Sequence, residues 1–155
     1  MKKIFLLTLL LLLLVGLMAC NSVSADLSNV SAAKMADSVK ESITFVDDMF
    51  NIKNDMVPDF YNLPDGVTEL KVFMSSSGAT AEELAIFKCD NAETAEAVVK
   101  ACEKRIEALK EKFEDYIPDE LIKIENAVIE KRDVFVMFVC ADSTEQAEEI
   151  FAEYK

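Results

Sequence analysis

The stretch ELAIFKCDNAETAEAVVKACEKRIEALKEKF (Glu83–Phe113) joins two apolar patterns of different period. Its first part, Glu83–Cys89, is a short apolar run that Asp90–Asn91 ends too early for a useful helix, so it predicts a strand. Across Ala95–Phe113 apolar residues recur every three or four positions, with lysines and glutamates between them, which predicts an amphipathic helix. Pro118 is expected to close this helix. A strand followed by a helix that can cover it is the unit from which we build the fold.

A second strand is expected before this unit, and a second unit after it. Val67–Met74 alternates between apolar and polar residues, which predicts a half-buried strand. Asn126–Glu130 and Val134–Cys140 predict a hairpin, and the second of these strands is apolar on both faces, as expected for a central strand covered on each side. Thr144–Tyr154 predicts the last helix, with a capping box at Ser143 and Gln146.

The region before the first strand is predicted to be helical. Apolar residues on one face predict a helix over residues 31–42, capped by Ser28 or Ser31. An extended break follows at residues 43–46, and a short helix is expected over residues 55–63. The sequence therefore predicts an α+β fold, with an antiparallel four-stranded sheet from two strand-strand-helix units and an N-terminal helical segment.

The amino end has the pattern of a secretory signal. Lys2 and Lys3 precede an apolar stretch from Ile4 to Ala19, which is short for a permanent membrane span. Leu17-Met18-Ala19-Cys20 resembles the bacterial lipobox, in which the cysteine sulfur receives a diacylglyceryl group and becomes the new amino terminus. We therefore expect a signal peptide over residues 1–19, a lipidated tether over residues 20–29 and a single domain over residues 30–155. A chance cysteine after a hydrophobic run is the alternative.

Charge and composition limit the partners of this domain. Without Lys2 and Lys3, 14 basic residues stand against 29 acidic ones, a net charge of −15. Such a surface repels nucleic acid and anionic lipid headgroups, so membrane attachment must come from the lipid on Cys20. The chain has no histidine, which excludes triads that use histidine and zinc sites that use imidazole. We expect no cofactor and no metal site.

Three cysteines follow Cys20, and each lies in an apolar pattern. Cys89, Cys102 and Cys140 are expected to be buried as small hydrophobic residues. A disulfide between Cys89 and Cys140, at two strand ends, is the alternative for an exported protein.

The candidate binding site is a serine-rich turn. Ser75, Ser76, Ser77, Gly78 and Thr80 could present backbone N–H groups and hydroxyls to an anion, although a plain hairpin turn explains the same residues. Two other patterns are weaker evidence for a functional site. Ser31 and Lys34 have the spacing of penicillin-recognising enzymes by chance, since the companion motifs are absent. The acidic pairs, which are Asp47-Asp48, Glu82-Glu83 and Asp119-Glu120, are interpreted as solvated.

Together with the lipobox, three stretches carry a family resemblance: SSSGATAEELAIFK, FEDYIPDE and NAVIEKRDVFVMFV. The chain resembles the small Gram-positive lipoproteins that contain the domain of unknown function 4358, over nearly its whole length. The resemblance implies a location and a fold but no activity, so it provides no catalytic residues.

The expected function is a lipid-anchored, non-enzymatic binding or adaptor module at the outer face of the cytoplasmic membrane, with an envelope protein or small ligand as its partner. An envelope enzyme that uses carboxylate or serine chemistry and a structural spacer without a ligand are the alternatives.

Overall fold

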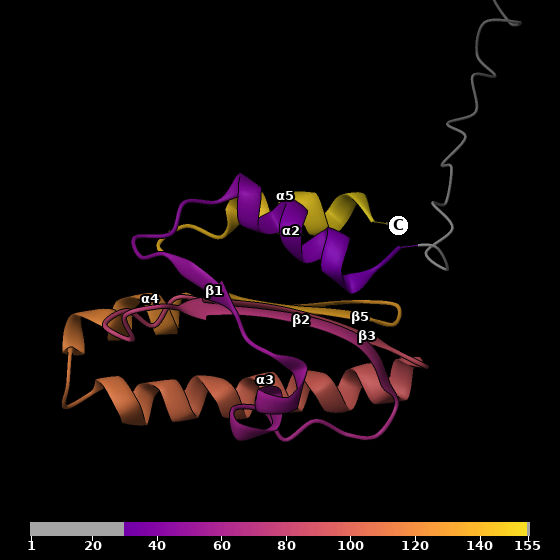
Figure 1. The fold of residues 1–155 in the computed structure, drawn as a ribbon, viewed down its shortest axis with the longest axis horizontal. Helices are drawn as coiled ribbons and strands as arrows, with labels where there is room; N and C mark the ends of the chain where they lie inside the picture. The colour runs from indigo at the N-terminus through magenta and orange to yellow at the C-terminus, as the bar shows by residue number, and fades with distance from the viewer. Residues whose placement is uncertain (1–29, 155) are drawn as a thin grey trace, which may run out of the picture.

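The domain has three layers, with a sheet between two layers of helices (Figure 1). A computed structural model describes residues 30–154. Helices α2 (Ala32–Ser42) and α5 (Glu145–Glu153) cover one face of the sheet, and the long helix α3 (Ala92–Phe113) covers the other. The predicted signal peptide and tether, with Cys20, lie outside the described residues. No helix within residues 30–154 combines the length and the apolar character needed to cross a membrane.

The sheet is antiparallel throughout, and its strands lie in the order β1-β2-β3-β5-β4. Their bounds are β1 (Met49–Asn51), β2 (Val67–Ser75), β3 (Glu83–Cys89), β4 (Val128–Arg132) and β5 (Phe135–Cys140). The two strand-strand-helix units are confirmed as β2-β3-α3 and β4-β5-α5. The prediction of four strands is wrong, because β1 adds a fifth at one edge. This strand has three residues, of which Phe50 and Asn51 are exposed, so it lacks the alternating pattern that reveals a strand.

The core lies on both faces of the sheet. Every residue of β5 is buried, which confirms a central strand with cover on each side. On the α3 face, β5 contributes Val136, Phe138 and Cys140. On the face of α2 and α5, the alternate residues Phe135, Met137 and Val139 pack against those helices.

Both boundaries of the first predicted helix are confirmed, and the ends of two other predicted helices are wrong. Ser31 caps α2, since its Oγ accepts a hydrogen bond from the Lys34 backbone N–H at 3.1 Å, and the chain is extended at Ile43. Helix α3 ends at Phe113, and Pro118 instead begins the short helix η3 (Pro118–Glu120). The short helix expected over residues 55–63 is instead the 3₁₀ helix η2 (Asn54–Asp59), which contains a proline. Helix α4 (Leu121–Glu125) has no counterpart among the predicted elements.

The capping box predicted for the last helix does not form. The N-cap residue of α5 is Thr144, and its side chain makes no capping hydrogen bond. The hydroxyl of Ser143 donates to the Glu145 carboxylate at 2.6 Å instead. Helix α5 is therefore fixed mainly by its apolar face, where Ala147 and Phe151 are fully buried.

Candidate functional site

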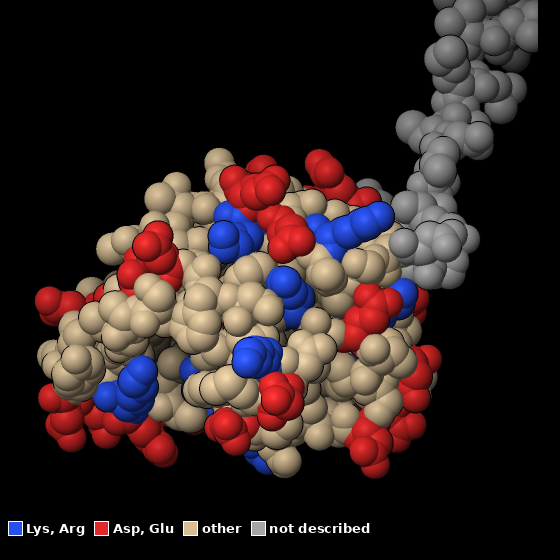
Figure 2. All heavy atoms as spheres, viewed as in Figure 1, with Lys and Arg blue, Asp and Glu red and all other residues tan. Residues whose placement is uncertain are grey.

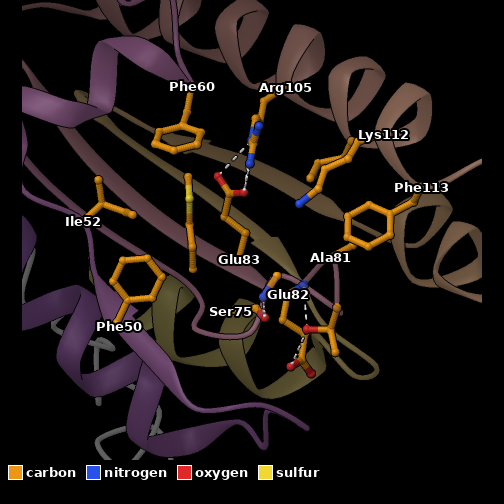
Figure 3. A pocket seen from close by; sticks show the side chains of 14 residues that line it. Phe50, Ile52, Phe60, Ser75, Ala81, Glu82, Glu83, Arg105, Lys112 and Phe113 are labelled. Carbon is orange, nitrogen blue, oxygen red and sulfur yellow. Dashed lines mark hydrogen bonds and ion pairs between the residues drawn. The ribbon is translucent and has the colours of Figure 1, made fainter. Parts of the chain in front are cut away.

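A cleft of about 160 Å³ opens at one end of the sheet, between α3 on one side and β1 with the segment after it on the other (Figure 3). Its apolar wall contains Phe50, Ile52, Phe60, Met74, Leu109 and Phe113. Its polar lining includes Ser75, Thr80, Glu82, Glu83, Arg105 and Lys112. On the face shown in Figure 2, the surface is hollowed toward the left, and a basic side chain lies beside the opening. Apolar walls with a few convergent polar groups are typical of small-ligand sites.

The floor of the cleft is a buried ion pair between β3 and α3. Glu83, the first residue of β3, is 1% exposed. Arg105 donates from Nη2 to Glu83 Oε2 at 2.7 Å and from Nε to the same oxygen at 3.0 Å. Tyr61, which is also buried, donates its hydroxyl to Glu83 Oε1. Burial alone would lower the pKa of Arg105, but the Glu83 carboxylate raises it above its ordinary value.

The tyrosine of this network is held as a neutral hydrogen-bond donor. Burial raises the pKa of Tyr61 well above its ordinary value, and the negative charge of Glu83 raises it further. Its ring packs edge-on against Phe87, with ring centroids 5.3 Å apart. Tyr61 and Arg105 therefore fix the Glu83 carboxylate in one position.

A second buried cation holds the loops around the cleft. The side chain of Lys123 on α4 is 6% exposed, and its Nζ lies 3.2 Å from Glu120, 3.5 Å from Asp142 and 3.6 Å from Glu82. Glu82 also accepts hydrogen bonds from the backbone N–H groups of residues 46 and 47, at 2.7 and 2.9 Å. Burial would lower the pKa of Lys123, but its hydrogen bond to Glu120 and the nearby carboxylates raise it. This cluster ties α4 to the loop before β1 and to the β2–β3 loop.

The predicted serine-rich site is an anion-binding turn whose anion comes from the chain itself. The Asp47 carboxylate accepts hydrogen bonds from the hydroxyls of Ser75 and Ser77, both at 2.5 Å, and from the Ser77 backbone N–H at 2.9 Å. These donors hold the pKa of Asp47 well below its usual range. Ser76 is more distant, with its hydroxyl 3.4 Å from Asp47. Of the five predicted residues, only Ser75, Gly78 and Thr80 line the cleft.

The prediction that all the acidic pairs are solvated is wrong for Glu82 and Glu83, which are buried and paired with cations. Asp47 accepts hydrogen bonds from the serine-rich turn, and Glu120 forms an ion pair with Lys123. Asp48 and Asp119 are exposed as predicted. A sequence signal for the ion pair did exist, because Arg105 lies three residues after Cys102 and four before Leu109, on the apolar stripe of α3. A charged residue on a buried stripe indicates a buried partner.

The cysteines are buried and free, so the predicted alternative of a Cys89–Cys140 disulfide is wrong. The register between β3 and β5 pairs Cys140 with Glu83, at the opposite end of β3 from Cys89. Six residues of strand, about 20 Å, separate these ends. Burial raises the pKa of Cys89 to about 11 and that of Cys140 to about 12, and it raises the pKa of Cys102 further. None of the three is therefore a reactive thiolate at neutral pH.

The predicted S-x-x-K pattern also has a structural explanation. The Ser31 hydroxyl caps α2 through the Lys34 backbone, so this S-x-x-K pattern is a helix start. Within residues 30–154, no group of three or more cysteines and carboxylates has the arrangement of a metal site.

Comparisons with curated proteins and with solved structures return no match. The family model described as a domain of unknown function (DUF4358) matches residues 34–141, which is more than half of the chain. The matched segment runs from α2 through β5 and contains the residues that line the cleft. The chain therefore belongs to the DUF4358 family.

Proposed function

We propose that this chain is a binding module, anchored by a lipid on Cys20 at the outer face of the cytoplasmic membrane of a Gram-positive bacterium, and that the cleft holds its ligand. The observation that carries the binding role is the combination of an apolar wall with a floor whose charges are already paired. A rigid, neutralised floor positions a ligand without supplying a free acid, base or nucleophile.

The direction of the cleft supports an anchored module. The backbone N–H of Ala32 donates to Glu69 at 2.9 Å, and Lys88 donates to the Val30 carbonyl at 2.9 Å. Glu69 and Lys88 are register partners near one end of β2 and β3, whereas the cleft lies at the other end of these strands. Five residues of β3, or about 17 Å, separate Lys88 from Glu83. The described domain therefore begins, at Val30, near the end of these strands away from the cleft, so a tether over residues 20–29 would attach at that end.

Lipid attachment is tested in the native cells. With an alkyne-bearing fatty acid in the medium, the wild-type chain should become labelled and sediment with the membranes. The Cys20→Ala variant should carry no label. An unlipidated wild-type chain in the culture medium would overturn the anchoring part of the proposal.

Binding is tested by site-specific photocrosslinking in the same cells. A photoreactive phenylalanine analogue at Phe50, which is 45% exposed at the cleft, should give a distinct adduct. The same analogue at Ile122, which is 68% exposed on α4 and does not line the cleft, is the matched control. Adducts that do not depend on the site would favour a structural spacer.

An envelope enzyme is the second candidate, and the observation that favours it is that Glu82, Glu83 and Ser75 line the cleft. Each of these carboxylates already has a buried cationic partner, and Ser75 donates to Asp47, so all three groups would need to be released before they could act. If the protein is an enzyme, the molecules captured at Phe50 should be chemically altered in the wild type and intact in the Glu82→Gln variant.

A further inference from the structure

We propose that the ligand of the cleft is a single carboxylate attached to one apolar group of about the size of a benzene ring. This inference rests on the proposed binding role, and it adds the chemical class of the ligand. The carboxylate would be bound by Lys112 and by the outer nitrogen, Nη1, of Arg105.

The size of the apolar group follows from the cleft. A dry cavity of about 150 Å³ with an apolar lining holds one benzene molecule, and the cleft measures about 160 Å³. Phe50, Ile52 and Phe60 approach from one side, and Leu109 and Phe113 approach from α3 (Figure 3). One ring or one branched aliphatic group would therefore fill the space between them.

The first carboxylate donor is the unused end of Arg105. A guanidinium has five N–H donors, and Glu83 occupies Nε and Nη2. Nη1 makes no hydrogen bond to any residue of the described range 30–154. The buried side-chain atoms without partners in that range are Glu130 Oε2 and Arg132 Nε. Nη1 is not among them, so this nitrogen is accessible to solvent, and Arg105 is one of the residues that line the cleft.

The second donor is Lys112. Figure 3 shows its amine turned toward the middle of the cleft, between Arg105 and Phe113. Its Nζ lies 4.7 Å from the Phe113 ring centroid, and within residues 30–154 it forms no ion pair. Arg105 is paired with Glu83 and Lys123 with Glu82, whereas Lys112 is the lining cation without a carboxylate partner in the described range, so its amine is available to a negative group on a ligand. One carboxylate on the ligand would pair with Lys112, whereas a ligand with several negative charges would be repelled by Glu82, because its cation Lys123 is shared with Glu120 and Asp142.

The test uses the processed, lipidated chain in nanodiscs, with the methionine methyl groups labelled with ¹³C. Met74 lines the cleft, whereas Met35 and Met137 lie in the core on the opposite face and serve as internal controls. The probes are 3-phenylpropanoate and its neutral amide, together with an N-acetylated Gly-Gly-Phe peptide that carries either a free carboxylate or a terminal amide. Empty nanodiscs measure partition of each probe into lipid.

The expected result is that 3-phenylpropanoate shifts the Met74 signal and leaves Met35 and Met137 unchanged. The amide should bind about three- to fivefold more weakly, as for the loss of one partly exposed charge pair. Lys112→Gln should weaken binding of the carboxylate by a similar factor and leave binding of the amide unchanged. The control Lys104→Gln, also on the exposed surface of α3 but outside the cleft lining, should change neither.

Two failures are distinguishable. If acid and amide shift Met74 with equal affinity, the carboxylate class is overturned while binding in the cleft stands. If no probe shifts Met74, the ligand class is overturned, and the photocrosslink at Phe50 decides separately whether the cleft binds a partner. Tighter binding of the peptide acid than of 3-phenylpropanoate would support the carboxylate class and identify the ligand as a peptide carboxyl terminus. The reverse order would also support the carboxylate class and identify the ligand as a free small carboxylate.

Discussion

The two faces of the sheet are built from the same strands but differ in chemistry. Between the sheet and helices α2 and α5 lies an apolar cluster, with the partly buried Glu130–Arg132 ion pair beside it, where the Arg132 guanidinium is 5.8 Å from the Phe151 ring centroid. On the α3 face, the core also contains the Glu83–Arg105–Tyr61 network, and the cleft opens above it. A buried ion pair is weak evidence for stability, because its desolvation offsets its attraction. The first face is therefore mainly a packing surface, whereas the polar groups of the second also shape the floor of the cleft.

The largest expected effect comes from breaking the ion pair on the α3 face. Arg105→Met leaves the buried Glu83 carboxylate without its cation, so we expect the free energy of unfolding to fall by about 3–5 kcal/mol. Urea unfolding followed by far-ultraviolet circular dichroism measures it.

The control removes the whole network. In the triple variant Arg105→Met, Glu83→Leu and Tyr61→Phe, no buried charge or unpaired hydroxyl remains, so most of the lost stability should return. A triple variant no more stable than Arg105→Met would mean that the network is needed for the fold itself, and the contrast between the two faces would fail.

A matched pair of methionines sharpens the comparison. Met137→Ala on the apolar face should cost about 2–5 kcal/mol, because a closed core cannot fill the cavity that remains. Met74→Ala should cost less, since Met74 lines the open cleft and is 7% exposed, so water can enter the space. Equal losses in urea unfolding would show that the cleft is packed like the rest of the core.

Periodicity predicted most of the fold, because β3, β5 and α3 are long and have continuous apolar stripes. It missed β1, whose three residues become a strand only by pairing with the end of β2. It singled out the serine-rich turn, of which Ser75, Gly78 and Thr80 line the cleft, but it did not predict that Asp47 is bound there. Asp47 and Ser77 are 30 positions apart and meet only after β1 has paired with β2, so no local pattern could connect them.

The two helices on the apolar face should respond differently to loss of a serine near their start. Ser31→Ala removes the hydroxyl that caps α2 and should cost about 1 kcal/mol. Ser143→Ala should cost less, because Ser143 bonds to the Glu145 side chain and caps no backbone group of α5. A larger loss at Ser143 would restore the capping box predicted from the sequence.

The smallest effect is expected at the turn beside the cleft, and it depends on pH. The pKa of Asp47 is lowered in the folded state by the donors Ser75 and Ser77, so this carboxylate adds stability above its unfolded pKa of about 3.9. That contribution is lost as the pH falls from about 4 through the lower folded-state pKa. Ser77→Ala should therefore lower the urea midpoint at neutral pH, and its difference from the wild type should shrink below about pH 4. Ser76→Ala is the matched control, since its hydroxyl is 3.4 Å from Asp47, and a similar loss for both variants at every pH would show that the turn depends on serine itself and not on the Asp47 charge.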